Sequence, residues 1–524
     1  MLNFENLLCE DAVTGVAASF FVKNQEDIKV KEFMKTVTDA ITVGNNAVNG
    51  VVWGTFGIAL LLIAGIVMTV VNKGFQFTHF GHWMKRTIGA IFKDRHVTAH
   101  TEKENKAISQ FQSLCTAMAA TIGTGNIVGV ATAIILGGPG AIFWMWIMAI
   151  FGMMTNYSEN VLGIYYRRKG KSGEWRGGAM YYLKDGLGGY KGMKWVGTIL
   201  AVLFSIFCLL ASFGIGNMGQ VNSIAGNMES AFNIPPYVTG IALVILGALI
   251  ILGGLKRVAS IAEKLVPFMA ILYIIGAFIV IFAHVANVPA VFVAIFKGAF
   301  CFKAGAAGAV GYGLQKAITW GFKRGAFSNE AGLGSSVMVH SSSNVKEPVR
   351  QGMWGIFEVF VDTIIVCTLT ALVVLSSGLV DLETGKVISE NAGASLVGEA
   401  FGTVFGGLGG KFIAIAILLF AFSTVLGWSH YGTTAWQYLF GEKTQVLYKV
   451  IFVVMIYFGC TMSLNLAWDL SDTFNGLMMI PNLIGVLALC PLVSRITKNY
   501  VDRELKGKDV EPMLSVFDKK DKKE

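Results

Sequence analysis

Charged residues are scarce in this chain, and that scarcity decides its class before any motif is considered. Only 14% of the 524 residues are Asp, Glu, Lys or Arg, whereas about a quarter of the residues in a soluble domain are charged. Hydrophobic residues make up 54% of the chain, and its mean hydropathy is +0.61. These values exclude an ordinary soluble domain. They predict an all-α polytopic membrane protein whose surroundings are a lipid bilayer.

Several signatures are absent, and each absence removes a class of function. The seven cysteines contain no C-x-x-C pair, so they predict neither a disulfide framework nor a thiolate metal site. No H-E-x-x-H, G-x-S-x-G or Walker A run occurs, so neither a membrane-embedded enzyme nor an ATP-driven pump is supported. His79 with His82, and His96 with His100, have ligand-like spacings. Both pairs lie in a charged loop without cysteine, which favours a solvated face over a metal site.

Apolar runs of membrane-spanning length recur along the chain. About 20 apolar residues cross the hydrocarbon core as a helix. Eleven runs of this kind lie at residues 51–71, 112–136, 141–165, 195–225, 237–254, 262–283, 308–340, 354–376, 412–439, 446–463 and 471–494. A further apolar stretch, Ala394 to Phe405 in the loop 376–411, is too short to span. It predicts either a cap helix over an external vestibule or an ordinary interfacial helix.

Positive charge is distributed as membrane topology requires, so the net charge of +9 needs no nucleic acid as a partner. With loop 72–109 in the cytoplasm, the loops and tail on that side carry 31 Lys and Arg, and the other side carries nine. Because cytoplasmic loops are enriched in Lys and Arg, this split predicts an outside N-terminus and a cytoplasmic C-terminus. Three regions follow: an extracytoplasmic segment at 1–48, a transmembrane domain at 49–495 and a charged cytoplasmic tail at 496–524.

The apolar segment at residues 115–140 is interrupted near its middle. The interrupting residues are Thr121, Gly123, Thr124, Gly125, Asn126 and Gly129. In lipid every backbone N–H and C=O needs a partner, so a broken helix persists only where protein or a cavity surrounds it. Breaks near the bilayer midplane are where transporters bind a small solute or ion. This segment therefore makes the chain a transporter candidate.

A second interruption lies in residues 321–343. It contains Gly325, Phe327, Ser328, Asn329, Glu330, Gly332 and Gly334. If the run 51–71 is an extra leading helix, the first break falls in core helix 1 (about 112–136) and the second in core helix 6 (about 308–340). Ten core helices then divide into five plus five, and a broken helix opens each half. This is the pattern of inverted-repeat secondary transporters.

The groups that the two breaks would free suit an amino acid and a cation. Backbone N–H groups around Gly123, Thr124 and Gly125 would lie at the N-terminus of a half-helix, which favours a carboxylate. Glu330 could neutralise an ammonium group or a cation. Oxygens that suit Na⁺ are supplied by the side chains of Thr121, Asn126, Ser328 and Asn329. The glycines leave little room for side chains, which fits a small ligand.

Four runs of the sequence resemble one known family. They are NGVVWG before the first span, TIGTGNIVGVA at the first break, RGAFSNEAGLGSS at the second, and VRQGMWGIFEVFVDTIIVCTLTAL after it. Together they are similar to the alanine or glycine:cation symporter family over residues 49–495, and FSNEAGLGS is the most specific motif. The resemblance implies a LeuT-like fold of ten core helices plus one. It also implies uptake of alanine or glycine coupled to Na⁺, or in some members to H⁺.

The resemblance implies roles for individual residues. The substrate site would comprise Thr121, Gly123, Thr124, Gly125, Asn126, Gln220, Phe327, Ser328, Asn329 and Glu330. Within it, Gly123 and Gly125 would bind the substrate carboxylate, and Phe327 would act as an aromatic lid. Asn126 would help to bind a cation. A second Na⁺ site would comprise the carbonyls of Ala119 and Ile122 and the hydroxyls of Ser423 and Thr424.

Structural roles compete with some of these assignments. The hydroxyls of Ser423 and Thr424 could bond to the preceding helical turn, and this role is weighed equally with Na⁺ binding. Gln220 could serve as a polar contact between helices.

Ionisable residues inside the predicted spans are functional by default, because burying them in lipid is costly. Glu358 and Asp362 are four residues apart on one helix face, so two like charges need a partner. Arg324 paired with Asp362 or Glu330 would supply one, and a structural role for this pair is favoured over a gate. Glu159, close to the cytoplasmic arginines, is interpreted as structural.

The sequence therefore predicts a monomeric symporter of the cytoplasmic membrane. It would move a small neutral amino acid, alanine or glycine, together with Na⁺ by alternating access. Proton coupling in the same fold is the alternative, with Glu330 as first candidate, and a channel is less favoured because no polar stripe follows a whole helix. We expect Phe327 to limit side-chain size, so that larger amino acids such as leucine are excluded. The choice between alanine and glycine stays open.

Overall fold

The computed structural model describes residues 36, 38–101, 107–170, 173–300, 307–462 and 465–515. The chain divides into two compact units, Met1–Gly50 and Val51–Glu524. In the first unit, residues 38–50 are helical. Most of the expected segment 1–48, and residues 516–524 of the expected tail, lie outside the described residues. The motifs of both breaks belong to the second unit.

The second unit is built almost entirely from helices. In its first half these are α2 (Thr55–Val71), α3 (Phe75–Thr78), α4 (Phe80–Arg86), α5 (Ile88–Lys93), α6 (Arg95–Thr98), α7 (Gln110–Thr121), α8 (Val128–Gly137), α9 (Gly140–Tyr166), α10 (Ala179–Tyr181), α11 (Lys194–Phe213) and α12 (Gly219–Phe232). In its second half they are α13 (Pro236–Ile251), α14 (Leu255–Ala283), α15 (Val288–Ala299), α16 (Ala307–Asn329), α17 (Val337–His340), α18 (Pro348–Val359), α19 (Thr368–Ser376), α20 (Gly393–Phe405), α21 (Leu408–Phe440), α22 (Gln445–Thr461), α23 (Asn465–Ala488) and α24 (Cys490–Glu504).

Seven helical segments of the described residues are long and apolar enough to cross a membrane. They are Thr38–Val71, Gly140–Tyr166, Lys194–Phe232, Leu255–Ala283, Pro348–Ser376, Leu408–Phe440 and Glu442–Thr461. The bent pair Asp469–Ala488 and Cys490–Glu504 makes eight if it counts as one span. A helical multi-pass membrane protein is therefore confirmed, but the expected count of eleven is not. Length explains the difference: the first broken span leaves α8 with 10 residues, and α13 has 16.

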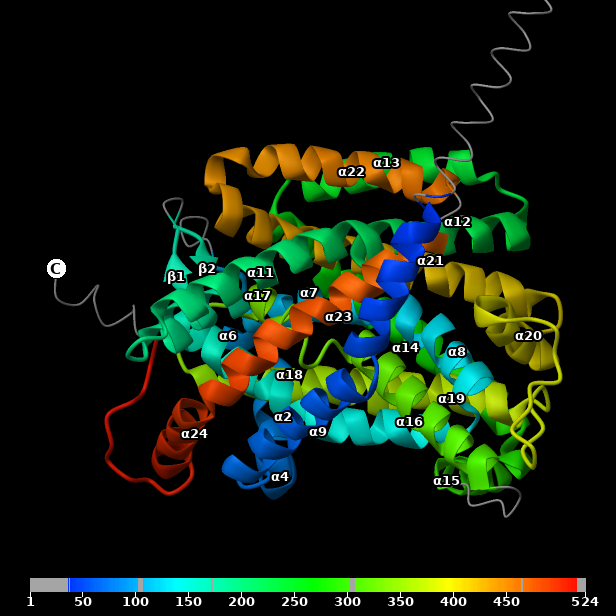
Figure 1. Cartoon of the computed structure of the whole chain (residues 1–524), viewed down its shortest axis with the longest axis horizontal. Coiled ribbons are helices and arrows are strands. Elements are labelled where there is room, and N and C mark those ends of the chain that lie inside the picture. Colours follow the sequence, from blue (N-terminus) through cyan, green and yellow to red (C-terminus); the bar gives the residue numbers. More distant parts are fainter. Residues whose placement is uncertain are drawn as a thin grey trace, which may run out of the picture. The chain divides into compact units, whose positions relative to one another are not determined.

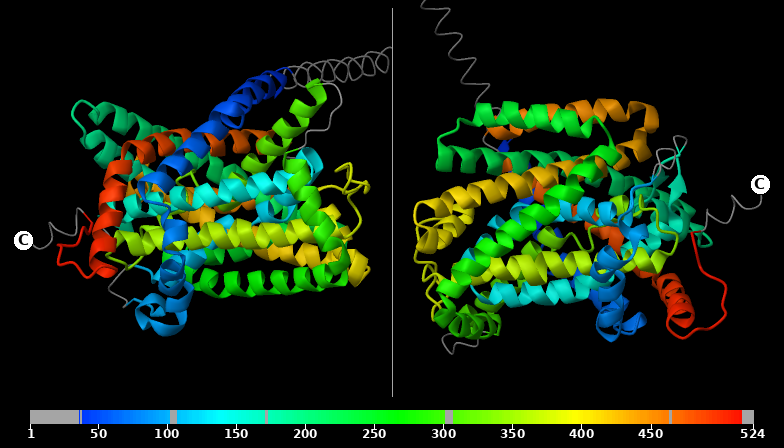
Figure 2. Two further views of the ribbon diagram at one scale, coloured as in Figure 1. Left: turned by 90° about the horizontal axis from the view of Figure 1, so that it is seen from below. Right: turned by 180° about the vertical axis from the view of Figure 1, so that it is seen from behind.

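The helices pack in two groups that share the first broken segment. In one group, α16 and α18 both pack along α9. In the other, α11 packs on α21 and α23, α12 on α21, and α13 on α22. Helix α7 contacts α14 and α21, whereas α8 contacts α16 and α9, so the broken segment touches both groups. Figures 1 and 2 show most of these long helices running side by side in roughly one direction.

The helices differ from the predicted spans in several places. The run predicted at 195–225 extends to Phe232 through a π-helical turn at Gly214–Met218. The run predicted at 262–283 begins at Leu255, because charged residues continue a helix beyond its apolar part. The run predicted at 471–494 bends by 59° between α23 and α24, where Pro491 opens the second helix. Helix α15 is not among the predicted spans because it is shorter than a membrane crossing.

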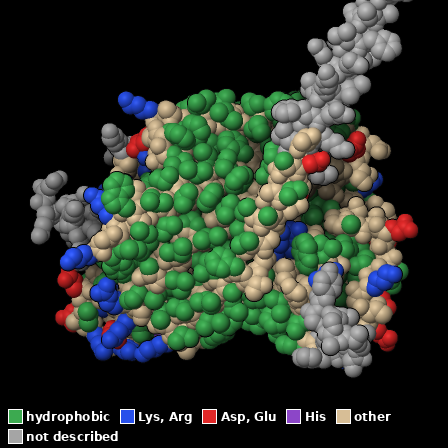
Figure 3. Space-filling view, in the orientation of Figure 1, with side chains coloured by type: hydrophobic (Ala, Val, Ile, Leu, Met, Phe, Trp, Pro, Cys, Tyr) green, Lys and Arg blue, Asp and Glu red, His purple; other side chains and the backbone are tan. Residues whose placement is uncertain are grey.

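Two loops also contain ordered elements. Helix α20 forms in the loop 376–411 at the predicted apolar stretch and packs against α21 and α8. Strands β1 (Arg168–Lys169) and β2 (Trp175–Arg176) form an antiparallel hairpin in which Arg168 is opposite Arg176. In Figure 3 a broad hydrophobic surface ends at a cluster of Lys and Arg, at the side where Figure 1 places this hairpin and α24.

Candidate functional site

The first break replaces one turn of helix by a short irregular segment. A capping box begins α7: the Ser109 hydroxyl accepts from the Gln112 N–H at 3.1 Å, and the Gln112 side chain accepts from the Ser109 N–H at 3.2 Å. Helix α7 ends at Thr121, a 3₁₀ turn follows at Thr124–Asn126, and α8 begins at Val128.

Asn126 ties this break to the helix that follows α18. Its side-chain oxygen accepts from the Gly123 N–H at 3.0 Å, so it fills part of the freed backbone. Its Nδ2 donates to the Asp362 carboxyl at 2.6 Å, in a π-helical turn at Phe360–Cys367. A buried carboxyl and a buried amide are thereby joined directly behind the break.

Glycine at the first break allows close approach of three other elements. A Cβ at position 123 would collide with Oγ1 of Thr424 and would lie 3.4 Å from Oε1 of Gln220. A Cβ at position 125 would lie 3.1 Å from the Phe327 ring and 3.2 Å from the Ser328 backbone. Glycine at these two positions is therefore what lets the first break touch α12, α16 and α21.

The second break begins where α16 ends at Asn329. Glu330 takes a left-handed φ of +56°, and Gly332 and Gly334 follow with φ of +89° and +74°. A left-handed conformation is costly for a residue with a Cβ, so it persists only where neighbours fix it. Here the Glu330 carboxylate accepts from the Ser335 hydroxyl at 2.6 Å and from the Trp428 indole N–H at 2.8 Å.

One buried cavity lies between the two breaks. Its volume is about 10 Å³, which is room for about one water molecule. Its lining includes seven of the predicted residues: Thr121, Gly123, Gly125, Gln220, Phe327, Glu330 and Thr424. The structure thus brings the two motifs, and two further predicted helices, to one closed space.

Three predicted substrate residues are buried but do not line this cavity. Asn126 and Asn329 face other partners, since the Asn329 side chain donates to Thr363 Oγ1 at 3.0 Å and accepts from the Ala331 N–H at 3.0 Å. The Ser328 hydroxyl lies 3.3 Å from Cys367 Sγ. A fourth, Thr124, lines a neighbouring cavity, and its N–H donates to Gln220 Oε1 at 3.4 Å.

The cavity also has lining residues that are not among the predicted ones: Ala120, Ile215, Trp428 and Asn475. Trp428 carried a sequence signal, because it lies one helical turn after Thr424 on α21 and would share its face. Asn475 had little sequence signal, since polar residues surround it at the start of its span and nothing in that pattern points to a ligand.

The residues of the expected second Na⁺ site are close together. Ser423 Oγ lies 3.2 Å from the Ala119 carbonyl and 2.7 Å from the Phe420 carbonyl. Thr424 Oγ1 lies 3.1 Å from the same Phe420 carbonyl. Ile122 is buried immediately after α7. Both hydroxyls therefore bond to the preceding turn, as the structural alternative requires, and Ser423 additionally reaches α7.

The predicted pairing of Arg324 with Asp362 or Glu330 is wrong. Its guanidinium instead lies over the rings of Trp320 and Phe327, with its central carbon 5.3 and 5.5 Å from their centroids. The neighbouring Lys323 makes an ion pair with Asp472 at 2.5 Å. Arg324 and Phe327 line one cavity, whereas Glu330 lines the central cavity and Asp362 is hydrogen-bonded to Asn126.

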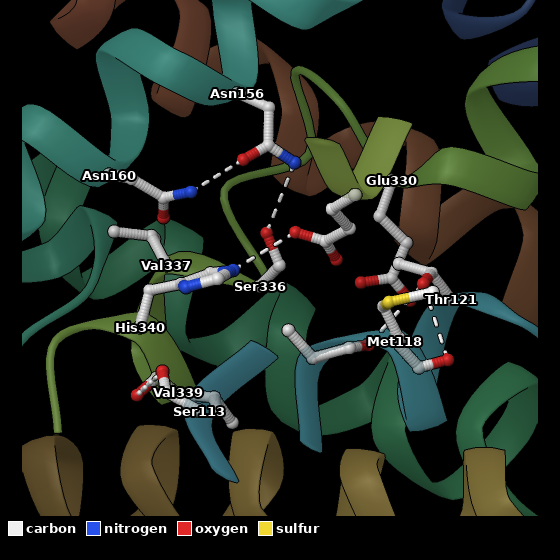
Figure 4. Close-up of polar contacts among 12 residues, drawn as sticks. Ser113, Met118, Thr121, Asn156, Asn160, Glu330, Ser336, Val337, Val339 and His340 are labelled. Carbon is white, nitrogen blue, oxygen red and sulfur yellow. Dashed lines mark hydrogen bonds and ion pairs between the residues drawn. The ribbon is translucent and has the colours of Figure 1, made fainter. Parts of the chain in front are cut away.

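The two carboxyl groups on one helix face have separate partners. Asp362 accepts from Asn126, as described above, and from the Thr363 hydroxyl at 2.8 Å. Glu358 lies 3.0 Å from Nε2 of His340, and both side chains are fully buried. Figure 4 shows His340 in a polar cluster with Ser336, Asn156 and Asn160, away from Glu330 and Thr121. A further buried carboxyl, Glu159, accepts from Asn482 at 2.5 Å, which fits its structural interpretation.

The histidine pairs in loop 72–109 have partners other than metal. The His79 ring stacks on Phe75 with centroids 4.7 Å apart, and His82 Nε2 lies 3.1 Å from the Tyr500 hydroxyl. Burial lowers the pKa of His79 and of His82. Among the described residues, no three or more His, Cys, Asp or Glu side chains are grouped so that they could hold a metal ion.

Two larger cavities also lie in the helical unit. One has a volume of about 270 Å³ and is lined by Thr124, Arg324, Phe327, Asp469 and Asp472, among others. Phe327 lines both this cavity and the central one, so its ring separates them. The other, of about 110 Å³, lies beside the β1–β2 hairpin and α21.

Comparison with known proteins agrees with this geometry. The chain matches the sodium:alanine symporter family over residues 38–514. It is 43% identical over 455 residues to the sodium/alanine symporter AgcS of Methanococcus maripaludis, covering 87% of this chain and 96% of that protein. It is 38% identical over 463 residues to GlnT of Bacillus subtilis, named a probable sodium/glutamine symporter, covering 88% of this chain and 91% of GlnT. AlsT of the same organism, an amino-acid carrier protein, is 35% identical over 444 residues, with 84% and 90% covered. The chain is a transporter and not an enzyme, and it belongs to the sodium:alanine symporter family.

Proposed function

We propose that this chain couples the inward flow of Na⁺ to the uptake of alanine or glycine across the cytoplasmic membrane. The single observation that carries the proposal is the closed cavity to which both interrupted helices contribute. Gly123 and Gly125 line it from the first break, and Phe327 and Glu330 line it from the second. The cavity now has room for about one water molecule and must widen to admit an amino acid. Its polar lining supports an amino acid as substrate, and family membership supports Na⁺ as the coupling ion.

The substrate would lie between the two breaks. Its carboxylate would be bound by the backbone around Gly123 and Gly125, at the start of the half-helix that continues as α8. The Gly123 and Thr124 N–H groups would exchange their present bonds to Asn126 and Gln220 for bonds to the substrate. Its ammonium group would face Glu330, whose carboxylate is held by Trp428 and Ser335. Thr121 and Gln220 would contact it from the sides, and Thr124, Ser328 and Asn329 would support this shell from behind.

The coupling ion would bind next to the substrate. Asn126 and the Asp362 carboxyl behind it supply oxygens at the first break. A second position would use the carbonyls of Ala119 and Ile122 and the hydroxyls of Ser423 and Thr424. Occupancy of one ligand would then raise the affinity of the other, because both order the same broken helix. Proton coupling remains the alternative, with Glu330 as the group that would carry the proton.

The fold that goes with this function is an inverted repeat. We propose α2 as a leading helix followed by ten core spans: α7–α8, α9, α11–α12, α13, α14, α16–α17, α18–α19, α21, α22 and α23. A broken span then opens each half of five. The clustered Lys and Arg beside the hairpin and α24 support a cytoplasmic C-terminus and an outside N-terminus. We propose that the functional unit is the monomer, because one chain supplies the whole cavity lining.

The experiment is uptake of labelled alanine into proteoliposomes of purified protein. We expect concentrative uptake with an inward Na⁺ gradient and none when K⁺ replaces Na⁺. Labelled glycine should follow alanine, and labelled leucine should not accumulate because Phe327 closes the cavity. Uptake that is driven by a pH gradient in the absence of Na⁺ would show that H⁺, not Na⁺, is the coupling ion. Folded protein that takes up neither amino acid under either gradient would refute the assignment.

A further inference from the structure

The polar groups that line the central cavity are almost all engaged by the protein itself. Both oxygens of Glu330 accept hydrogen bonds, from Ser335 and Trp428. Gln220 accepts from the Thr124 N–H and donates to the Ile215 carbonyl at 2.9 Å. The hydroxyls of Thr121 and Thr424 are directed to carbonyls of their own helices.

Asn475 on α23 is the exception among the cavity-lining side chains. Its residue is 1% exposed and lines the cavity, yet its side-chain oxygen has no hydrogen-bond partner among the described residues. A buried acceptor without a partner costs free energy, because it has lost its bond to water without replacing it. Several buried side chains of this chain share that property, but Asn475 is the one among the described residues that lines the central cavity. In a transporter such a group has an evident partner, which is the substrate.

The position of Asn475 is fixed by close packing of α23 on both sides. The next residue is Gly476, where a Cβ would lie 2.7 Å from Nε1 of Trp53. The Trp53 indole also donates to the Asp472 carbonyl of α23 at 3.0 Å. One turn before Asn475, Ser471 presses against the Gly214 backbone, leaving no room for a Cβ there. These contacts fix the backbone of α23 at Asn475, beside the cavity that its side chain lines.

Chemistry selects which end of an amino acid can satisfy this oxygen. A carboxylate only accepts hydrogen bonds, so it cannot pair with a second acceptor. An ammonium group carries three donors and no acceptor. The Glu330 carboxylate lines the same cavity, so an ammonium group there would have both a charged and a neutral oxygen to bond.

We propose that Asn475 is a substrate-binding residue that accepts a hydrogen bond from the substrate's ammonium group. This inference rests on the proposed amino-acid symport and deepens it. It makes α23 part of the substrate site, in addition to the two broken helices, α12 and α21. It also gives the site a reason to select α-amino acids over carboxylates of the same size, because only the ammonium group satisfies the buried oxygen.

The test measures equilibrium binding of labelled alanine to purified protein in saturating Na⁺. Asn475→Leu, similar in size but without the acceptor, should raise the Kd about 10- to 100-fold, as expected for loss of a hydrogen bond to a charged group. Asn475→Asp keeps an acceptor at the same place, so its Kd should stay within about threefold of the wild type or fall. Asn222→Leu is the matched control. Asn222 donates its amide to the Gly459 carbonyl of α22 and the Met462 carbonyl after it, and it lies outside the cavity, so the Kd of this variant should not change.

Each outcome decides between support and refutation. Unchanged binding by Asn475→Leu would overturn the inference. Weaker binding by Asn475→Asp than by Asn475→Leu would also overturn it, because that order means the side chain faces the carboxylate. Thermal melting in detergent shows whether each variant is folded. If Asn475→Leu is not folded, the binding of alanine by Asn475→Asp still tests the inference. Wild-type protein that binds no alanine would refute the proposed function itself, which is a separate result.

Discussion

The two interrupted helices line the same cavity but present opposite chemistry to it. The first break contributes Gly123 and Gly125, which have no side chains, so its backbone is what a ligand would meet. The second break contributes the aromatic ring of Phe327 and the carboxyl of Glu330. A broken helix can thus form a site either by uncovering its backbone or by directing side chains inward. Together the two suit the two charged ends of one amino acid.

The breaks also differ in what keeps them irregular. The first is stabilised by a side chain, because Asn126 replaces part of the missing helical hydrogen bonding by accepting from the Gly123 N–H. The second depends on left-handed backbone at Glu330, Gly332 and Gly334. The Glu330 conformation costs on the order of 1 kcal/mol, and the bonds from Ser335 and Trp428 offset it. A change at either break should therefore affect a different end of the substrate.

The largest effect is expected from a side chain at the first break. Gly123→Val places a Cβ where Oγ1 of Thr424 already lies, so the break must move. We expect alanine uptake to fall more than about 100-fold, because a displacement of about 1 Å is enough for such a loss. Initial uptake rates in proteoliposomes measure this.

The control for that change is a helical position where glycine has open space, Gly226. Gly226→Ala on α12 meets no atom within 4 Å, so uptake should be unchanged. Equal losses for the two variants would mean that any added side chain impairs the protein, and the special role of Gly123 would be lost.

A change of charge at the second break is expected to be the next largest. Glu330→Gln keeps an oxygen for the Trp428 indole but removes the negative charge facing the substrate. We expect the KM for alanine to rise about 10- to 100-fold, the cost of weakening a charged hydrogen bond. Na⁺-driven uptake that persists at high alanine concentration would support a substrate role. Loss of all dependence on a pH gradient would instead assign Glu330 to proton coupling.

A smaller effect, on the ion rather than the amino acid, is expected at the back of the first break. Asn126→Ala removes the bonds to the Gly123 N–H and to Asp362. We expect the Na⁺ concentration for half-maximal uptake to rise about tenfold. The alanine Kd in saturating Na⁺ should change by less than about threefold. A change in the alanine Kd without a change in the Na⁺ response would assign Asn126 to substrate binding rather than to ion binding.

The smallest effect is expected at the second Na⁺ position. Ser423→Ala removes a hydroxyl that reaches the Ala119 carbonyl, so half-saturation by Na⁺ should rise about two- to tenfold. Ser205→Ala on α11 is the matched control, because Ser205 is also buried and bonds only to the Ala201 carbonyl, at 2.8 Å. If both variants shift stability but neither shifts the Na⁺ response, Ser423 is a packing residue.

The two breaks could be predicted from sequence because each combines glycine and polar residues inside an apolar run. That pattern locates the irregular backbone. It also predicted that Gly123, Gly125, Phe327 and Glu330 would lie close together, and all four line the central cavity. It could not tell which side chains face inward, so Ser328 and Asn329 turned out to contact Cys367 and Thr363. The direction in which a side chain points depends on where each helix ends, and the spacing of residue types along the chain does not give that position.

Contacts between distant helices were the least predictable part. The expected partner of Arg324 was a buried carboxyl, yet the guanidinium lies over two aromatic rings. Asn475 reaches the cavity only because α23 packs tightly on Trp53 and Gly214. Such contacts depend on three-dimensional packing rather than on local pattern. Pro491 is a local sequence signal for the bend between α23 and α24, but nothing in the local sequence predicts the angle of that bend.

The central claim is that both breaks bind one amino acid together with Na⁺. Equilibrium binding of labelled alanine to purified wild-type and Gly123→Val protein, with Na⁺ or with K⁺, tests it most directly. The account predicts saturable binding of one alanine per chain to the wild type in Na⁺, much weaker binding in K⁺, and none detectable to folded Gly123→Val protein. Equal binding in Na⁺ and K⁺, or binding by Gly123→Val equal to that of the wild type, would contradict it.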